Sequence, residues 1–217
     1  MNFSDLFDLS HTQAEEYLKL FKYPWEALAS LKEYIISTGE KLDKDYMQVS
    51  PFVWVHKNAN VAGSACICAP CIIGAFAEIR HCAYIRGSVL VGKGCVIGNS
   101  TEVKNSILFD GVQLPHFNYA GDSILGFKAH LGAGAIISNV KADKCPVTVK
   151  GEGIEFDTGL KKFGALIGDG AEVGCNAVIN PGSVIGKNTI IYPLSSVRGI
   201  IPADSIFKNC GKVILKN

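Results

Sequence analysis

Residues 77–104 read AEIRHCAYIRGSVLVGKGCVIGNSTEVK, and this stretch contains the period that decides the fold. Every sixth position is aliphatic, and a mostly small residue stands two positions before it; the aliphatic positions are Ile79, Ile85, Val91, Ile97 and Val103. A period of six fits neither a helix nor a simple alternating strand. It is typical of hexapeptide repeats, in which six residues form a short strand and a corner, and three such sides close one coil of a parallel β-helix.

The same period continues on both sides of this stretch. It includes Val61, Ile67 and Ile73, and it returns at Leu125, Leu131, Ile137, Ile167, Val173, Ile179, Ile185, Ile191 and Val197. These seventeen repeats predict between five and six coils at three repeats per coil. We therefore predict an all-β fold, a left-handed parallel β-helix of hexapeptide repeats, with an N-terminal helical extension.

The period divides the chain into two parts. Residues 1–50 lack it and read as helical: Thr12 and Glu15 form a potential capping box, and Pro24 can open a second helix that ends at Gly39. Leu28, Leu31 and Ile35 would share one apolar face of that second helix. Residues 51–217 form the predicted β-helix, with a loop insertion near 138–164 and a C-terminal cap.

Two interruptions of the period predict loops, where function concentrates in repeat proteins. From Val103 to Leu125 the spacing is 22 residues rather than 24, and this stretch contains the segment 115–122. The second interruption is the 138–164 insertion, which is rich in Lys, Asp and Gly.

Composition narrows the class of partner and the compartment. The 217 residues carry a net charge of +1, which gives no general attraction to nucleic acid or to acidic membranes. No basic–apolar leader and no membrane-spanning run is present, so we expect a cytoplasmic protein. Of the eight cysteines, Cys68 and Cys71 form a CxxC, but a second ligand pair is missing. We expect reduced, buried thiols and no structural zinc.

Arg86 and Lys104 each follow an aliphatic repeat position and stand 18 residues apart, which is one full coil. They should stack at the same corner, where two like charges repel unless an anion binds to them. A phosphate would suit this pair. The alternative is a solvated corner in which Glu102 neutralises part of the charge, and the spacing leaves both open.

His116 lies in the first interruption, near Tyr119 and Asp122. An imidazole can accept a proton from an amine near neutral pH, and a neighbouring carboxylate or carbonyl can fix its tautomer. A single loop histidine can equally be a packing or surface residue. Lys141 and Lys144 open the second interruption and are either solvated or close over a charged ligand.

At these residues the chain resembles the acetyltransferase half of the bifunctional enzymes that acetylate glucosamine-1-phosphate and then uridylylate it. The matching segments are 83–87 (AYIRG), 102–105 (EVKN), 116–122 (HFNYAGD), 131–134 (LGAG) and 138–144 (SNVKADK). The stretch 147–165 further resembles the archaeal-type sugar-1-phosphate nucleotidylyltransferase/acetyltransferases, and Tyr23-Pro24-Trp25-Glu26 resembles their linker helix.

The resemblance implies an N-acetyltransferase that transfers acetyl from acetyl-coenzyme A to the amine of an amino-sugar-1-phosphate, in UDP-N-acetylglucosamine synthesis. His116 would be the catalytic base. The substrate-binding residues would be Arg86 and Lys104 on the phosphate, Tyr119 and Asn139 on the sugar, and Lys144 from the loop.

On the donor side, Ala133 and Cys175 match positions that line the acetyl-coenzyme A groove, although the family has a hydroxyl residue at the second. The resemblance also implies a homotrimer with sites between subunits, and no metal for acetyl transfer. Two departures stand out: His130 replaces the family's Asn, and no nucleotidylyltransferase loop is present. Uridylyl transfer would then depend on a separate nucleotidylyltransferase.

Three other readings compete with this one. A zinc-dependent carbonic anhydrase of the same fold would need histidines paired across coils, which the spacing of His116 and His130 does not give. A non-catalytic trimeric scaffold for a separate nucleotidylyltransferase would not need a base beside a phosphate site. An acyltransferase acting on a nucleotide sugar would use the same phosphate corner.

Overall fold

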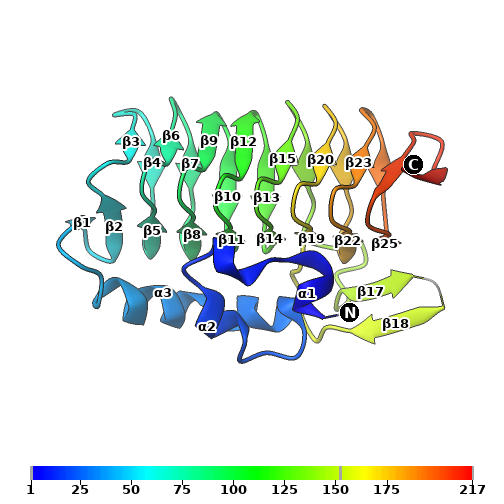
Figure 1. Ribbon diagram of the computed structural model, residues 1–217, viewed down its shortest axis with the longest axis horizontal. Helices are drawn as coiled ribbons and strands as arrows, with labels where there is room; N and C mark the ends of the chain where they lie inside the picture. Colours follow the sequence, from blue (N-terminus) through cyan, green and yellow to red (C-terminus); the bar gives the residue numbers. More distant parts are fainter. Residues whose placement is uncertain (1, 152, 217) are drawn as a thin grey trace.

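A computed structural model describes residues 2–151 and 153–216, which form a three-sided parallel β-helix of about eight coils (Figure 1). In every coil the chain passes from side 1 to side 2 to side 3, so each side is a sheet of strands from successive coils. We name the corners edge 1–2, edge 2–3 and edge 3–1. The predicted fold class is confirmed.

Each side pairs its strands in parallel along the coil axis, with an antiparallel strand added at two of the ends. Side 1 consists of β1 (Tyr46–Ser50), β2 (Val53–His56), β5 (Cys71–Ile73), β8 (Val89–Val91), β11 (Ser106–Leu108), β14 (Ile124–Leu125), β19 (Ala165–Ile167), β22 (Ser183–Ile185) and β25 (Ile200–Ile201). Side 2 consists of β3 (Asn60–Val61), β6 (Glu78–Ile79), β9 (Val96–Asn99), β12 (Gln113–His116), β15 (His130–Leu131), β20 (Glu172–Val173), β23 (Ile190–Ile191), β26 (Ser205–Phe207) and β27 (Val213–Leu215). Side 3 consists of β4 (Cys66–Ile67), β7 (Tyr84–Ile85), β10 (Glu102–Lys104), β13 (Tyr119–Gly121), β16 (Ile136–Ile137), β21 (Val178–Ile179) and β24 (Ser196–Val197).

The aliphatic repeat residues fill the interior of the coils, as the period predicts. Ile85, Val103 and Ile137 are fully buried on side 3. Cys71 and Cys95 are also fully buried, and burial raises the pKa of the Cys95 thiol to about 12. The expectation of buried thiols is wrong for five other cysteines, which occupy exposed positions: Cys66, Cys82, Cys145, Cys175 and Cys210.

The prediction of five to six coils is wrong, and so is the prediction of a loop between Val103 and Leu125. The chain continues there through β11, β12 and β13 in unbroken parallel register. Two corners at edge 3–1 are each one residue shorter than the period of six. Leu108 follows Val103 by five positions, and Leu125 follows Ala120 by five. At these shortened corners Asn105 and Asp122 adopt positive φ angles of 45° and 49°, which short polar side chains tolerate.

The outward face of side 1 is as apolar as the inward face, and the N-terminal segment covers it (Figure 1). Outward residues Ile72, Leu90 and Ile107 are fully buried, and each such side chain stabilises the fold by roughly 1.5–3 kcal/mol. The covering elements are α1 (Phe3–Leu6), η1 (Leu9–His11), α2 (Glu15–Leu18), η2 (Pro24–Ala29) and α3 (Leu31–Gly39).

The predicted helices of this arm form with altered boundaries. Pro24 opens the short 3₁₀ helix η2 rather than α3, and the predicted apolar face of Leu28, Leu31 and Ile35 is buried. The capping box is wrong, because the Thr12 hydroxyl accepts a hydrogen bond from the Ala14 amide, 3.2 Å away, two residues ahead. None of the helices in the described residues is long and apolar enough to cross a membrane.

The insertion after β16 continues the cover of side 1. It contains the antiparallel hairpin of β17 (Thr148–Gly151) and β18 (Ile154–Asp157), and β17 lies beside β22 and β25. Trp25 of the arm packs against Phe156 of β18 and against Phe163, which is fully buried. Arm and hairpin therefore form one continuous layer that leaves sides 2 and 3 uncovered (Figure 1).

Candidate active site

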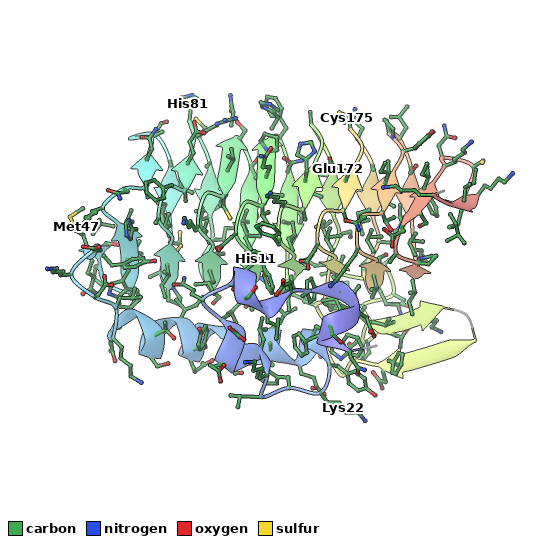
Figure 2. All side chains as sticks on the ribbon, viewed as in Figure 1. His11, Lys22, Met47, His81, Glu172 and Cys175 are labelled. Atoms are coloured by element: carbon green, nitrogen blue, oxygen red, sulfur yellow. The ribbon has the colours of Figure 1, made fainter. Side chains whose placement is uncertain are left out.

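His116, Ala133 and Cys175 lie one above another at edge 2–3, on three successive coils. On side 2, Leu114 pairs with Ile97 of the preceding coil and Gln113 pairs with His130 of the next coil. Leu131 then pairs with Val173 of the coil after that. The corners are joined directly: Gly134 N donates to His116 O at 3.0 Å, and Asn176 N donates to Ala133 O at 2.9 Å. Figure 2 marks this edge by His81 and Cys175, on the far side of the coils from the arm.

The corner at His116 is rigid, while its imidazole is exposed. Asn118 is buried and accepts a hydrogen bond from the His116 amide (3.2 Å), while its own amide donates to Gly132 O (2.7 Å) on the next coil. Among the described residues no hydrogen bond to the imidazole ring is present, so the expected fixing of its tautomer by a neighbouring carboxylate is absent there. Phe117 beside it is 60% exposed.

Arg86 and Lys104 stack at edge 3–1 on adjacent coils, as their 18-residue spacing predicts. Ile85 pairs with Val103, and Arg86 N donates to Val103 O at 2.8 Å. Each cation has its own carboxylate: Arg86 Nη1 lies 2.7 Å from Glu102 Oε1, and Lys104 Nζ lies 3.1 Å from Asp122 Oδ2. The two charges are thus neutralised within the chain.

Asp122, which we did not predict from the sequence as a site residue, is the centre of a buried polar cluster. The residue is 3% exposed, and its carboxylate accepts hydrogen bonds from Lys104 Nζ, Asn105 Nδ2 (2.9 Å) and Asn139 Nδ2. The Asn105 amide also reaches Leu28 O of the arm at 3.4 Å. The sequence signal that could have found this cluster is the pair of shortened corners, because Asn105 lies in one and Asp122 in the other.

Tyr119 and Asn139 meet this cluster from the outward face of side 3. Burial raises the pKa of the Tyr119 hydroxyl, and the negative charges of Asp122 and Glu102 raise it further, so the phenol stays protonated. Gly121 makes room for both side chains: a Cβ there would lie 2.6 Å from the Tyr119 hydroxyl and 2.7 Å from Asn139 Nδ2. The structure therefore brings Lys104, Tyr119 and Asn139 together.

Two other residues lie outside both groups. Lys144 is exposed in the insertion, with a φ of 58° and an amide that donates to Lys141 O. His130 points outward from side 2 and lies 2.7 Å from the Glu172 carboxylate. In the part of the chain that the structure describes, no group of three His, Cys, Asp or Glu residues lies close enough to hold a metal ion.

The histidine and the cations lie at opposite edges of side 3. Lys104 pairs with Gly121, which follows His116 by five positions. Five residues span at most about 17 Å. The seven residues of the two groups therefore lie toward the two long edges of side 3, with His116, Ala133 and Cys175 at one edge and Arg86, Lys104, Tyr119 and Asn139 toward the other.

Comparison with protein families gives two adjacent matches. Residues 67–161 match the family described as "GMPPB C-terminal domain", and residues 164–199 match six bacterial transferase hexapeptide repeats. Together these matches span most of the β-helix, and the second is a match of its later coils to transferase hexapeptide repeats.

Two curated relatives are similar to parts of the chain. A bifunctional sugar-1-phosphate nucleotidylyltransferase/acetyltransferase of Sulfurisphaera tokodaii is 32% identical over 48% of this chain and 26% of its own length. The bifunctional protein GlmU of Methanococcus vannielii is 36% identical over 36% of this chain and 19% of its own length. The chain thus aligns with about a quarter or less of these relatives.

Solved structures match the chain at low sequence identity and low TM-score. The acetyltransferase domain of PglB from Neisseria gonorrhoeae, in complex with acetyl coenzyme A, is 16% identical, with a TM-score of 0.33 over 71% of this chain and 53% of that one. AntD, an N-acyltransferase of Bacillus cereus, is also 16% identical, with a TM-score of 0.36 over 73% of this chain and 82% of that one.

Proposed function

We propose that this chain is an N-acetyltransferase that transfers acetyl from acetyl-coenzyme A to the amine of an amino-sugar-1-phosphate resembling glucosamine-1-phosphate, in the synthesis of UDP-N-acetylglucosamine. The observation that carries the proposal is the column at edge 2–3. It sets His116, the proposed base, directly over Ala133 and Cys175, the proposed donor-groove residues.

In the proposed reaction, the exposed imidazole of His116 takes a proton from the ammonium or amine of the sugar, whose nitrogen attacks the thioester carbonyl. The C–S bond then breaks, and the coenzyme leaves as the thiol after it accepts a proton. The corner backbone at edge 2–3 supplies N–H groups, one means of stabilising the tetrahedral oxyanion. No covalent intermediate with the protein is needed.

The proposed acceptor site is at edge 3–1, where Arg86 and Lys104 hold the phosphate and Tyr119 and Asn139 contact the sugar, with Lys144 reaching in from the insertion. The proposed base and the proposed phosphate site thus lie at opposite edges of side 3. We therefore propose a homotrimer in which edge 2–3 of one chain meets edge 3–1 of its neighbour.

The outward residues of side 3 are suited to such a contact. Tyr84 and Val178 are 40% and 37% exposed on the uncovered face, whereas side 2 presents Glu78, His130 and Glu172. An apolar face packs against a second copy more readily than a charged one.

The test is release of free thiol from acetyl-coenzyme A by the purified protein, measured with a panel of amino-sugar phosphates. His116→Ala is expected to abolish turnover while the assembly stays intact. His81→Ala is the matched control, because His81 is an exposed histidine of the same column two coils away. Unchanged turnover in His116→Ala would show that the base is assigned wrongly.

A second candidate is a non-catalytic scaffold that binds a separate nucleotidylyltransferase. The observation that favours it is the pairing of both proposed phosphate-binding cations with carboxylates, Glu102 and Asp122. A scaffold would show no thiol release with any amino-sugar phosphate, and it would co-purify with the nucleotidylyltransferase when the two are expressed together.

A further inference from the structure

A cationic cleft lies further along edge 3–1, where the insertion folds back against the last coils. Ser138, Asn180 and Arg198 continue the column of Arg86 and Lys104 in the register of side 3. Arg198 is four coils beyond Lys104, about 19 Å away at one inter-strand spacing per coil. The Arg198 end of this cleft therefore lies apart from Arg86 and Lys104, while Asn139 and Lys144 of the proposed substrate site are sequence neighbours of residues that line it.

The cleft has two connected hollows on either side of Arg198. One, of about 280 Å³, is lined by Lys141, Thr148, Lys150, Pro181, Gly182, Arg198 and Gly199. The other, of about 390 Å³, shares Lys141, Pro181 and Arg198 and adds Ser138, Val140, Ala142, Asp143 and Asn180. Three cations from three separate segments thus line one concave surface.

Two glycines allow the backbone of strand β17 to lie close against this edge. A Cβ at Gly182 would lie 2.4 Å from Thr148 O, and a Cβ at Gly199 would lie 2.8 Å from Lys150 O. Both glycines have positive φ angles, 79° and 87°, which other residues adopt at a cost. The close approach fixes the strand, and so it fixes where Lys150 stands relative to the edge.

The alternation of β17 then directs two polar side chains outward. Val149 is fully buried, so its neighbours Thr148 and Lys150 face away from the core, and both line the cleft. The hydroxyl of Thr148 adds a neutral hydrogen-bond donor beside the cations.

Arg198 differs from the earlier cations of its column in what it contacts. Arg86 and Lys104 each have a carboxylate, whereas the contact of Arg198 among the described side chains is with Asn180 Oδ1 at 3.5 Å. In the described part of the chain, β24 is the last strand of side 3 and belongs to the coil of Arg198.

Among the described residues, the carboxylates that the two lysines contact belong to the insertion and are exposed. Lys141 lies 3.2 Å from Asp143, and Lys150 lies 2.8 Å from Glu155, with both carboxylate side chains 57% exposed. Exposed pairs of this kind contribute little to stability, so an incoming anion can displace them.

We propose that Lys141, Lys150 and Arg198 form a second anion site that binds a phosphate or diphosphate group. The guanidinium fork suits two phosphate oxygens, and the two ammonium groups add point charges on either side. Two sources would supply this group: the phosphates of coenzyme A, or those of a sugar phosphate or nucleotide sugar. This site does not depend on His116.

The test is isothermal titration of the full chain with inorganic pyrophosphate. Wild-type protein is expected to bind it saturably, and Arg198→Gln is expected to weaken binding about tenfold or more, since a charge-assisted hydrogen bond is lost. Lys150→Gln should weaken it as well, and Arg198→Lys less than Arg198→Gln. Arg80→Gln is the matched control, because Arg80 is a cation paired with Glu78 on side 2.

Competition then separates the two sources of phosphate. If coenzyme A displaces pyrophosphate and dephospho-coenzyme A does so less well, the cleft holds the coenzyme; if glucosamine-1-phosphate displaces it, the cleft holds the sugar phosphate. His116→Ala protein should bind pyrophosphate as wild type does, even if it proves that no acetyl transfer occurs. Equal affinity in wild type and Arg198→Gln of unchanged melting temperature, or no saturable binding, would overturn the proposal.

Discussion

The two ion pairs of edge 3–1 provide a quantitative test of the site geometry, because they are neighbours that differ in burial. The Lys104 and Asp122 side chains are 24% and 5% exposed, whereas those of Arg86 and Glu102 are 43% and 33% exposed. Water screens the second pair far more than the first. The Lys104–Asp122 pair should therefore show the larger coupling energy.

The magnitude follows from what each truncation leaves behind. Removing one partner of a buried pair costs about 3–5 kcal/mol, and Lys104 is partly solvated, so we expect Asp122→Ala to cost about 2–3 kcal/mol. Asp122→Ala also removes the acceptor that the side-chain amides of Asn105 and Asn139 share. In a cycle with Lys104→Met we expect a coupling of about 1–2 kcal/mol.

The assay is urea unfolding followed by circular dichroism, on each single variant and the double variant, at low and at high salt. The Arg86→Met and Glu102→Ala cycle serves as the control, and its coupling should be smaller and disappear at high salt. Equal couplings in the two cycles, or a Lys104–Asp122 coupling that salt abolishes, would refute the buried cluster around Asp122.

Two further predictions concern the arm and the interior. Burial raises the pKa of Asp169, whose carboxylate accepts from the amides of Asp8 and Phe127. Its contribution to stability is therefore greatest below its unfolded value and is lost as the pH rises through the folded pKa. The free energy of unfolding of wild type minus that of Asp169→Asn should fall as the pH rises above about 3.9, the pKa of an unfolded aspartate. In native protein Cys71 and Cys95 should resist a thiol reagent that labels Cys175 and Cys210, because burial raises the pKa of both thiols; rapid native labelling of Cys95, read by mass spectrometry, would contradict this.

The sequence predicted the fold because the period of six is a local pattern. Each aliphatic residue of the period predicts that its own side chain points into the coil, and Ile85 and Val103 are fully buried there. The docking place of the arm was also present in the sequence, in apolar pairs such as Ile72-Ile73 and Leu90-Val91, where both faces of a strand are apolar. A strand of this composition predicts burial on both faces.

The number of coils and the cluster around Asp122 were harder to predict because they depend on the register between coils. Removing one residue at a corner shifts the pairing to a spacing of 17, which a fixed period of six reads as a break. At the shortened corner the Asp122 carboxylate contacts the Lys104 ammonium of the preceding coil. The sequence spacing gave no measure of which carboxylate reaches which cation.

The separation of His116 from Lys104 leads to a prediction that only a shared site satisfies. If each proposed site joins edge 2–3 of one chain to edge 3–1 of another, then His116→Ala and Lys104→Ala chains are each inactive alone but complement each other when co-expressed. If the two kinds of chain assemble randomly in equal amounts, about one site in four combines an intact edge 2–3 with an intact edge 3–1. About a quarter of wild-type thiol release should therefore return. A control mixture of His116→Ala with the double variant should stay inactive, because no chain then supplies an intact His116. If the complementing mixture also stays inactive while assembling normally, the two edges do not combine across chains, and the proposal of a site shared between chains would be wrong.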